Sequence, residues 1–417
     1  MLEYLRCILK NPRLLAFGFL LTFCSSFGQT YFISLFSDEL RAMFDLGHGA
    51  FGTVYSLATL TSAFLMIWAG HFIDRIDLRI YTFAVSVLLI GAVFFMSQLP
   101  SGSVVFLYVA FLLLRFGGQG LISHAGITAV ARYVSEGRGK ALAIAGLGYS
   151  AGEAILPLTV IALVGIMGWQ SVWLVAAASL VVVLVPGAQW LLRGHGTRHD
   201  ALMASIAASD GAADRQFTRG QVLRDPFFWL IIPAALAPAF IVTGIFFNQR
   251  TIVAEMGWSM ALFAAGFTVY ALVTVTSSLL SGPLVDRLGA VKLFPFVLLP
   301  FGIGLLLLGL FDAPAIAILF MIATGMTMGI YYTASSALWA EVYGVRHLGA
   351  IKAMATSFMV FSTAISPALM GWLIDAGFTM ATISLMCAGW VVISTVLACL
   401  AARQRRITLR RYAELQA

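Results

Sequence analysis

Two short stretches decide the fold of this chain: Gly70-His-Phe-Ile-Asp74-Arg75-Ile-Asp-Leu-Arg79 and Gly282-Pro-Leu-Val-Asp286-Arg287-Leu-Gly-Ala-Val-Lys292. Each stretch follows an apolar run of about 20 residues, long enough to cross a bilayer, and precedes another apolar run. Each also combines a glycine, an aspartate and two cations in one short loop. A soluble domain seldom repeats such a loop at the same place in both halves, whereas a duplicated bundle of membrane helices would.

The composition requires a bilayer as the solvent for most of the chain. Of the 417 residues, 61% are hydrophobic and only 10% are charged, and the mean hydropathy is +0.96. No water-soluble fold could bury that much apolar surface. The net charge of +7 is divided among short loops and forms no single basic face, which argues against nucleic acid as a partner. The four cysteines have neither metal-site nor disulfide spacing, so we expect no metal and no cofactor.

Apolar stretches bounded by charged or turn residues predict twelve transmembrane helices. With the N-terminus inside, 22 of the 25 Lys and Arg residues fall in cytoplasmic segments. This bias satisfies the positive-inside rule, so we expect both termini in the cytoplasm. The expected helices lie at about 14–36, 50–70, 80–98, 104–130, 140–164, 170–192, 227–249, 258–281, 292–311, 314–339, 351–374 and 380–401.

The two halves of the chain correspond at a nearly constant offset. Asp74 precedes Asp286 by 212 residues, and Pro157 precedes Pro367 by 210. A steady offset of this kind indicates duplication into two halves of six helices each. The expected divisions are an N-terminal bundle at 1–193, a polar cytoplasmic linker at 194–225 and a C-terminal bundle with a short basic tail at 226–417.

The two opening stretches resemble the Gly-x-x-x-Asp-Arg-x-Gly-x-x-basic loop of the major facilitator superfamily of secondary transporters. In that family the loop lies between helices 2 and 3 and again between helices 8 and 9, which is where both stretches fall. The resemblance implies an all-α membrane protein with twelve transmembrane helices in two six-helix, pseudo-symmetric halves. It also implies salt bridges that hold a cytoplasmic gate closed, although loop cations can also serve only to set the topology. The residues concerned are Asp74, Arg75, Arg132, Asp286, Arg287 and Glu341.

Charged residues inside predicted helices are the strongest functional candidates, because a charge at mid-bilayer costs about 2.5–3.5 kcal/mol. Arg115 lies near the middle of the fourth helix and Glu153 near the middle of the fifth. The guanidinium could anchor a substrate carboxylate, with Gln119 one turn away, and Glu153 could carry a coupling proton. In the alternative, Arg115 and Glu153 pair with each other and only lock the two helices.

Weaker polar candidates lie on helices that are expected to line a substrate cavity, and helix packing alone could also explain each of them. Gln29 on the first helix and Tyr331 and Tyr332 on the tenth are the proposed substrate contacts. Further polar positions of this kind are Ser25, Tyr270, Thr274 and Ser336.

Several stretches are similar to the monocarboxylate and oxalate/formate branch of the superfamily, among them Leu223-Arg-Asp-Pro-Phe-Phe-Trp229. That branch often places an anion-binding arginine in the eighth helix. This chain has no cation between Arg250 and Arg287. Binding of an anion would therefore depend on Arg115 in the other half.

These observations favour a secondary transporter of a small organic anion, a monocarboxylate in the first instance, in the bacterial inner membrane. We expect proton symport by alternating access, a monomer in contact with membrane lipid, and no nucleic-acid partner. One alternative is an exporter of amphipathic drugs or metabolites. A second is a transporter-like receptor that senses a ligand without moving it. The sequence shows no nucleophile–base set and no phosphate loop, so we do not expect an enzyme.

Overall fold

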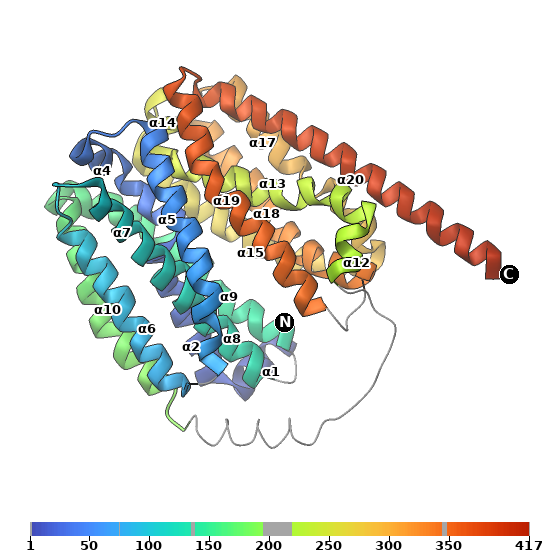
Figure 1. The fold of residues 1–417 in the computed structure, drawn as a ribbon, viewed down its shortest axis with the longest axis horizontal. Coiled ribbons are helices and arrows are strands. Elements are labelled where there is room, and N and C mark those ends of the chain that lie inside the picture. Colours follow the sequence, from blue (N-terminus) through green and yellow to red (C-terminus); the bar gives the residue numbers. More distant parts are fainter. Residues whose placement is uncertain (1, 75, 135–137, 195–218, 344–347, 417) are drawn as a thin grey trace. The chain divides into compact units, whose positions relative to one another are not determined.

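The computed structural model describes residues 2–74, 76–134, 138–194, 219–343 and 348–416. Within these ranges all regular structure is helical, which confirms the expected all-α fold. The chain forms two compact units, Met1–Ala212 and Ala213–Ala417 (Figure 1).

The first unit begins with a membrane segment made of several short helices, followed by long ones. Side-chain caps fix where two of the long helices begin, since Asp77 accepts from the Arg79 amide at 2.8 Å and Ser103 accepts from the Val105 amide at 3.3 Å. The helices are α1 (Leu2–Lys10), α2 (Pro12–Cys24), η1 (Ser25–Gly28), α3 (Thr30–Ile33), η2 (Ser34–Phe36), α4 (Ser37–Phe44), α5 (His48–Ala69), η3 (Gly70–Asp74), α6 (Leu78–Ser97), α7 (Val104–Leu114), η4 (Arg115–Ile122), α8 (Ser123–Tyr133), α9 (Arg138–Met167) and α10 (Trp169–Leu191).

The second unit has the same general plan of long apolar helices joined by short turns. Asp225 caps α13 by accepting from the Phe227 amide at 3.0 Å, and Pro226 occupies the first turn, where no amide donor is needed. The helices are α12 (Arg219–Arg224), α13 (Pro226–Phe247), α14 (Gln249–Glu255), α15 (Met260–Leu288), α16 (Ala290–Leu293), η5 (Phe294–Phe296), α17 (Leu299–Leu310), α18 (Pro314–Tyr343), α19 (Leu348–Asp375) and α20 (Met380–Gln416).

The described residues contain eleven helices that are long and apolar enough to cross a membrane, and the number is twelve if a bent pair is counted as one broken span. The bent pair is Pro12–Gly28 with Thr30–Phe44, and its two arms meet at 45°. The continuous helix expected at 14–36 is therefore wrong in detail, because Gln29 adopts an extended backbone with φ −82° and ψ 150°. This break between η1 and α3 lies beside the first candidate site.

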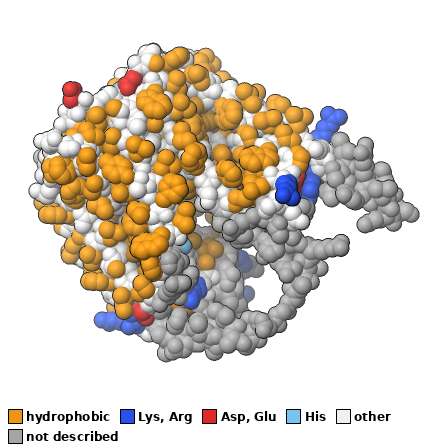
Figure 2. Space-filling model, in the orientation of Figure 1, with side chains coloured by type: hydrophobic (Ala, Val, Ile, Leu, Met, Phe, Trp, Pro, Cys, Tyr) orange, Lys and Arg blue, Asp and Glu red, His pale blue; other side chains and the backbone are white. Residues whose placement is uncertain are grey.

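The surfaces of both units suit a lipid environment. Ile67 and Ile166 in the first unit and Leu280 in the second each expose more than three-quarters of their surface. Hydrophobic side chains are spread across the described surface in Figure 2, while Lys and Arg side chains lie at its edges. Exposed apolar area on this scale would be unfavourable in water and is normal against hydrocarbon tails.

Candidate functional site

A cation from the fourth membrane segment contacts the break in the first. Arg115 begins the π-helical stretch η4 and is only 2% exposed. Its Nη1 donates to the carbonyl oxygen of Gly28 at 3.0 Å and to Oγ1 of Thr30 at 3.4 Å. The guanidinium carbon lies 5.3 Å from the centre of the Tyr55 ring, a cation–π distance. Because Gln29 leaves the helix, the carbonyls before it lose their regular partners, and Arg115 supplies a donor to one of them.

The close approach of these two segments depends on glycine. A Cβ added to Gly118 would come within 2.8 Å of the Gly28 Cα. A Cβ added to Gly28 would lie 2.6 Å from the backbone nitrogen of Gln119. The structure thus brings together the backbone around three predicted substrate residues, Gln29, Gln119 and Arg115, and the two glutamine side chains are half-buried.

Arg115 retains a donor atom that the protein does not use. Its Nε is buried and has no hydrogen-bond partner among the described residues. The expected alternative, an ion pair between Arg115 and Glu153, is not found in the part of the chain that the structure describes. The guanidinium is held instead by the Gly28 carbonyl, the Thr30 hydroxyl and the Tyr55 ring.

Glu153 lies on α9 and is half-buried. Its neighbour Gly152 packs directly against Ser26 of η1, and a Cβ there would also lie 3.0 Å from Oη of Tyr31. Glu153, the predicted proton carrier, therefore lies next to a residue that packs on the broken first segment. Arg115 contacts the same segment two residues further along, at Gly28.

Two further polar contacts join the fourth segment to its neighbours. The hydroxyl of Tyr149, on the same helix as Glu153, lies 2.6 Å from Oγ of Ser123. Nε2 of His124 lies 3.2 Å from the carbonyl oxygen of Gly70, the first residue of the loop motif. These contacts connect the region of Arg115 to the helix of Glu153 and to the motif.

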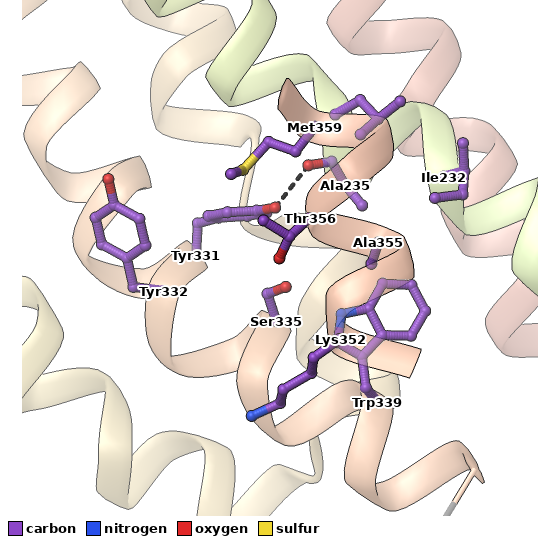
Figure 3. A pocket seen from close by; sticks show the side chains of 11 residues that line it. Ile232, Ala235, Tyr331, Tyr332, Ser335, Trp339, Lys352, Ala355, Thr356 and Met359 are labelled. Atoms are coloured by element: carbon purple, nitrogen blue, oxygen red, sulfur yellow. Dashed lines mark hydrogen bonds between the residues drawn. The ribbon is translucent and has the colours of Figure 1, made fainter. Parts of the chain in front are cut away.

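The second unit contains a cavity of about 230 Å³ between α13, α18 and α19 (Figure 3). Tyr331 and Tyr332, both predicted as substrate contacts, line it. Tyr331 is buried, and its hydroxyl donates to the carbonyl oxygen of Ala235 at 2.6 Å. Tyr332 is 55% exposed. The first tyrosine therefore fixes the wall between α13 and α18, while the second leaves more of its ring accessible.

Lys352 is the charged residue among the described residues that line this cavity. Thr356 follows it by one turn of α19, and Ser335 faces them from α18. In Figure 3 the hydroxyls of Ser335 and Thr356 point toward one another, with the ammonium group of Lys352 below them. The cavity of the second unit therefore has a cation in its wall, separate from Arg115.

Sequence analysis missed Lys352 because it was counted among the cytoplasmic cations at the start of the eleventh helix. Lys352 lies inside both the expected helix at 351–374 and α19, which begins at Leu348. The spacing of Lys352, Thr356 and Met359 would have shown that all three lie on one helix face.

The predicted gate residues are described only in part. The side chains of Asp74 and Asp286, and all of Arg75, lie outside the described residues. Among the others, Arg132 lies 5.8 Å from the ring centre of Tyr133, and the side chain of Arg287 is exposed.

Glu341 is the gate candidate with a defined contact. Its Oε2 accepts a hydrogen bond from the backbone nitrogen of Ala290 at 2.6 Å. Ala290 follows Gly289, whose φ of +80° suits glycine and allows the chain to turn between α15 and α16. Glu341 therefore connects α18, near its end, to the second loop motif. The described residues contain no group of His, Cys, Asp and Glu that could hold a metal ion.

Comparison with known proteins agrees with the helical plan and the loop motifs. The sequence profile of the Major Facilitator Superfamily matches residues 18–267 and 239–415. The chain belongs to this superfamily. This facilitator is accordingly a transporter and not an enzyme.

Solved structures similar to this facilitator include a bacterial homologue of the human lysosomal transporter Spinster, in two inward-facing crystal structures. The unoccupied form gives a TM-score of 0.66 at 14% identity and covers 93% of this chain and 96% of that one. The occupied form gives a TM-score of 0.67 at 14% identity, over 94% and 96% of the two chains. At such low identity the similarity shows the fold alone.

Two kinds of sequence relative differ in the substrates that their names suggest. The multidrug resistance protein B homologue of Mycobacterium tuberculosis is 33% identical over 135 residues, which is 32% of this chain and 25% of that protein. The match to this relative thus spans about a quarter of its length. The oxalate:formate antiporter of Oxalobacter formigenes is 22% identical over 370 residues, 84% of each chain.

Proposed function

We propose that this facilitator transports organic anions, monocarboxylates in the first instance, by alternating access. The observation that carries the proposal is the cavity of the second unit, whose lining includes Lys352 and the hydroxyl-bearing residues Ser335 and Thr356. An ammonium group and two hydroxyls can all donate to carboxylate oxygens. The similarity to an oxalate:formate antiporter over most of both chains supports the same class of substrate.

Arg115 is the second anion contact in this proposal. Its Nε is the donor that the protein leaves without a partner among the described residues, and Gln29 and Gln119 lie on the adjoining backbone. The guanidinium has a structural role at the same time, because Nη1 already bonds to the Gly28 carbonyl. Its substitution should therefore disturb both the fold and binding.

Glu153 is the proposed proton carrier, which makes the transporter a proton symporter. A carboxyl group within an apolar helix becomes neutral when it takes up a proton, so protonation can lower the barrier for a conformational change. Glu153→Gln, which imitates the neutral acid, should abolish accumulation driven by a pH gradient and leave exchange of substrate across the membrane largely intact. Reconstituted vesicles with and without an imposed pH gradient measure both activities. Uphill accumulation with unchanged pH dependence in the variant would exclude Glu153 as the carrier.

The distribution of charged residues supports a membrane location and a cytoplasmic gate. We infer a multi-pass monomer in a bacterial inner membrane, with both termini in the cytoplasm, because of the distribution of Lys and Arg. The proposed cytoplasmic gate consists of the two loop motifs and the ends of the helices beside them. The Glu341 contact with the Ala290 amide supports this assignment in the second unit. The gate residues are Asp74, Arg75, Arg132, Asp286, Arg287 and Glu341.

Lys352 offers the direct test. Lys352→Gln keeps a polar side chain but removes the charge, and loss of a charge-assisted hydrogen bond should weaken anion binding by about 10-fold or more. Titration calorimetry of the purified protein with acetate, lactate, formate and oxalate measures the change for each anion bound by the parent. Lys292→Gln on α16 is the matched control, because Lys292 is exposed and does not line the cavity. Equal affinities for parent and Lys352→Gln protein would contradict the proposal.

A second candidate function, export of amphipathic drugs, is favoured by the similarity to the multidrug resistance relative. The exposed ring of Tyr332 and the apolar walls of the cavity would suit such compounds. This function predicts that neutral and cationic compounds bind at least as well as carboxylates and that Lys352→Gln does not weaken them. The same titrations, extended to neutral aromatic compounds, separate the two functions.

A further inference from the structure

The cavity of the second unit is longer than its carboxylate-binding end requires. Lys352 and Met359 both line it, and seven helical residues separate them by about 10 Å along the axis of α19. Figure 3 shows Lys352 at the lower end of the cavity and Met359 at the upper end, beyond Tyr331 and Thr356. A formate or oxalate molecule held at Lys352 could not reach Met359.

We propose that the substrate is a monocarboxylate with a branched or aromatic apolar body, and that Met359 determines how large this body can be. The proposal rests on the anion-transport function proposed above and specifies its substrate. The carboxylate lies at Lys352, Ser335 and Thr356, and the apolar body extends along α19 toward Met359.

Charge restricts the substrate to one carboxylate. Of the described residues that line the cavity, Lys352 alone carries a full charge. A second carboxylate would enter the apolar end without a counterion, and an uncompensated charge in such surroundings is strongly unfavourable. The cavity therefore discriminates against dicarboxylates by leaving their second charge unpaired.

The rest of the cavity wall is largely apolar. Ile232 and Leu236 line it from α13, Trp339 from α18 beside Lys352, and Ala355 and Met359 from α19, with Met359 at the upper end (Figure 3). Ile232 and Trp339 are themselves buried, so they form fixed walls. An apolar body in contact with such walls leaves water, and each buried methylene should strengthen binding by about fourfold.

The volume supports a body larger than a methyl group. The cavity volume of about 230 Å³ is many times the roughly 10–15 Å³ that one water molecule requires on the same kind of measure. Formate or acetate would leave most of this space to water in contact with apolar side chains. Phenylacetate and isovalerate would replace that water with apolar contact.

A binding series on the full chain in lipid nanodiscs tests the inference. The probes are acetate, isovalerate, phenylacetate, malonate and the neutral phenylacetamide, titrated by calorimetry. We expect phenylacetate and isovalerate to bind at least tenfold more tightly than acetate, malonate no more tightly than acetate, and phenylacetamide not measurably.

The variant Met359→Trp fills the apolar end without touching the carboxylate-binding residues. It should weaken phenylacetate by at least tenfold and leave acetate within twofold of the parent. Phe361→Trp is the matched control, because Phe361 lies two residues further along α19, is 55% exposed and does not line the cavity. It should leave both affinities unchanged. Melting curves of both variants show whether either protein is misfolded. If Met359→Trp is misfolded, the smaller substitution Met359→Phe, for which we expect the same selectivity, tests the inference in its place.

The outcomes separate this inference from the proposed function. If acetate and malonate bind as tightly as phenylacetate and Met359→Trp affects all anions alike, the inference on the apolar body is wrong while anion transport stands. If phenylacetamide binds as tightly as phenylacetate, or no carboxylate binds, the anion function itself is wrong. Selective loss of phenylacetate and isovalerate in Met359→Trp supports both.

Discussion

Arg115 and Lys352 are the cations of the two candidate regions, and their surroundings differ in kind. Arg115 is almost fully buried, donates to the Gly28 carbonyl and lies against the Tyr55 ring. Lys352 is half-buried and lines a cavity beside the Thr356 hydroxyl. A planar guanidinium suits a fixed set of partners, whereas an ammonium on a flexible stem can follow a ligand that comes and goes. The comparison assigns stability chiefly to Arg115 and substrate binding chiefly to Lys352.

The largest expected effect concerns stability. Arg115→Ala removes a charged hydrogen bond and a cation–π contact, which together should lower the free energy of unfolding by about 3 kcal/mol. Lys352→Ala should lower it by less than about 1 kcal/mol, because Lys352 lies at a cavity wall. Thermal unfolding of both variants in the same detergent measures the difference. Equal losses of unfolding free energy, or a larger loss for Lys352→Ala, would contradict the assignment of stability chiefly to Arg115.

A smaller effect should follow from changing the backbone around Arg115 without changing any charge. Gly118→Ala would place a Cβ within 2.8 Å of the Gly28 Cα, which is backbone and cannot rotate away. We expect a loss of about 1–3 kcal/mol from this overpacking. Gly91→Ala on α6 is the control, since a Cβ there meets nothing within 4 Å and alanine favours the helix by about 0.5–1 kcal/mol. If both variants are equally stable, the contact between the two segments is not tight.

The sequence predicted the membrane spans well because hydrophobic length is a local property. It did not predict the break at Gln29, because the apolar run continues through Ser25 and Gly28 without a proline. Serine and glycine are known sites of helix kinks, and the break is also contacted by Arg115, which lies 87 residues away from Gly28 in the chain. A contact of that kind is tertiary and leaves no local pattern.

The candidate site was predicted only in part, because some of its features are local to one helix and others depend on tertiary contacts. Tyr331 and Tyr332 were selected as polar residues on an apolar helix, and both line the cavity. The cavity itself depends on how α13, α18 and α19 meet, which no single helix specifies. Lys352 was overlooked because a cation near a helix end satisfies the positive-inside rule and can also serve a binding site, and sequence position does not distinguish these roles.

The smallest expected effect is the energetic coupling between Arg115 and Glu153. An ion pair between them would make the double variant Arg115→Ala/Glu153→Ala more stable than the sum of the single losses predicts, because it removes both charges together. The described residues show Arg115 bonded to Gly28 and Thr30 and not to Glu153. We therefore expect the losses to add within about 0.5 kcal/mol. Melting curves of the parent, both single variants and the double variant complete the double-mutant cycle and give the coupling energy. A coupling energy above about 1 kcal/mol would mean that the two residues pair in another state of the transport cycle, and Arg115 would then belong with the moving charges of the protein and not with its fixed supports.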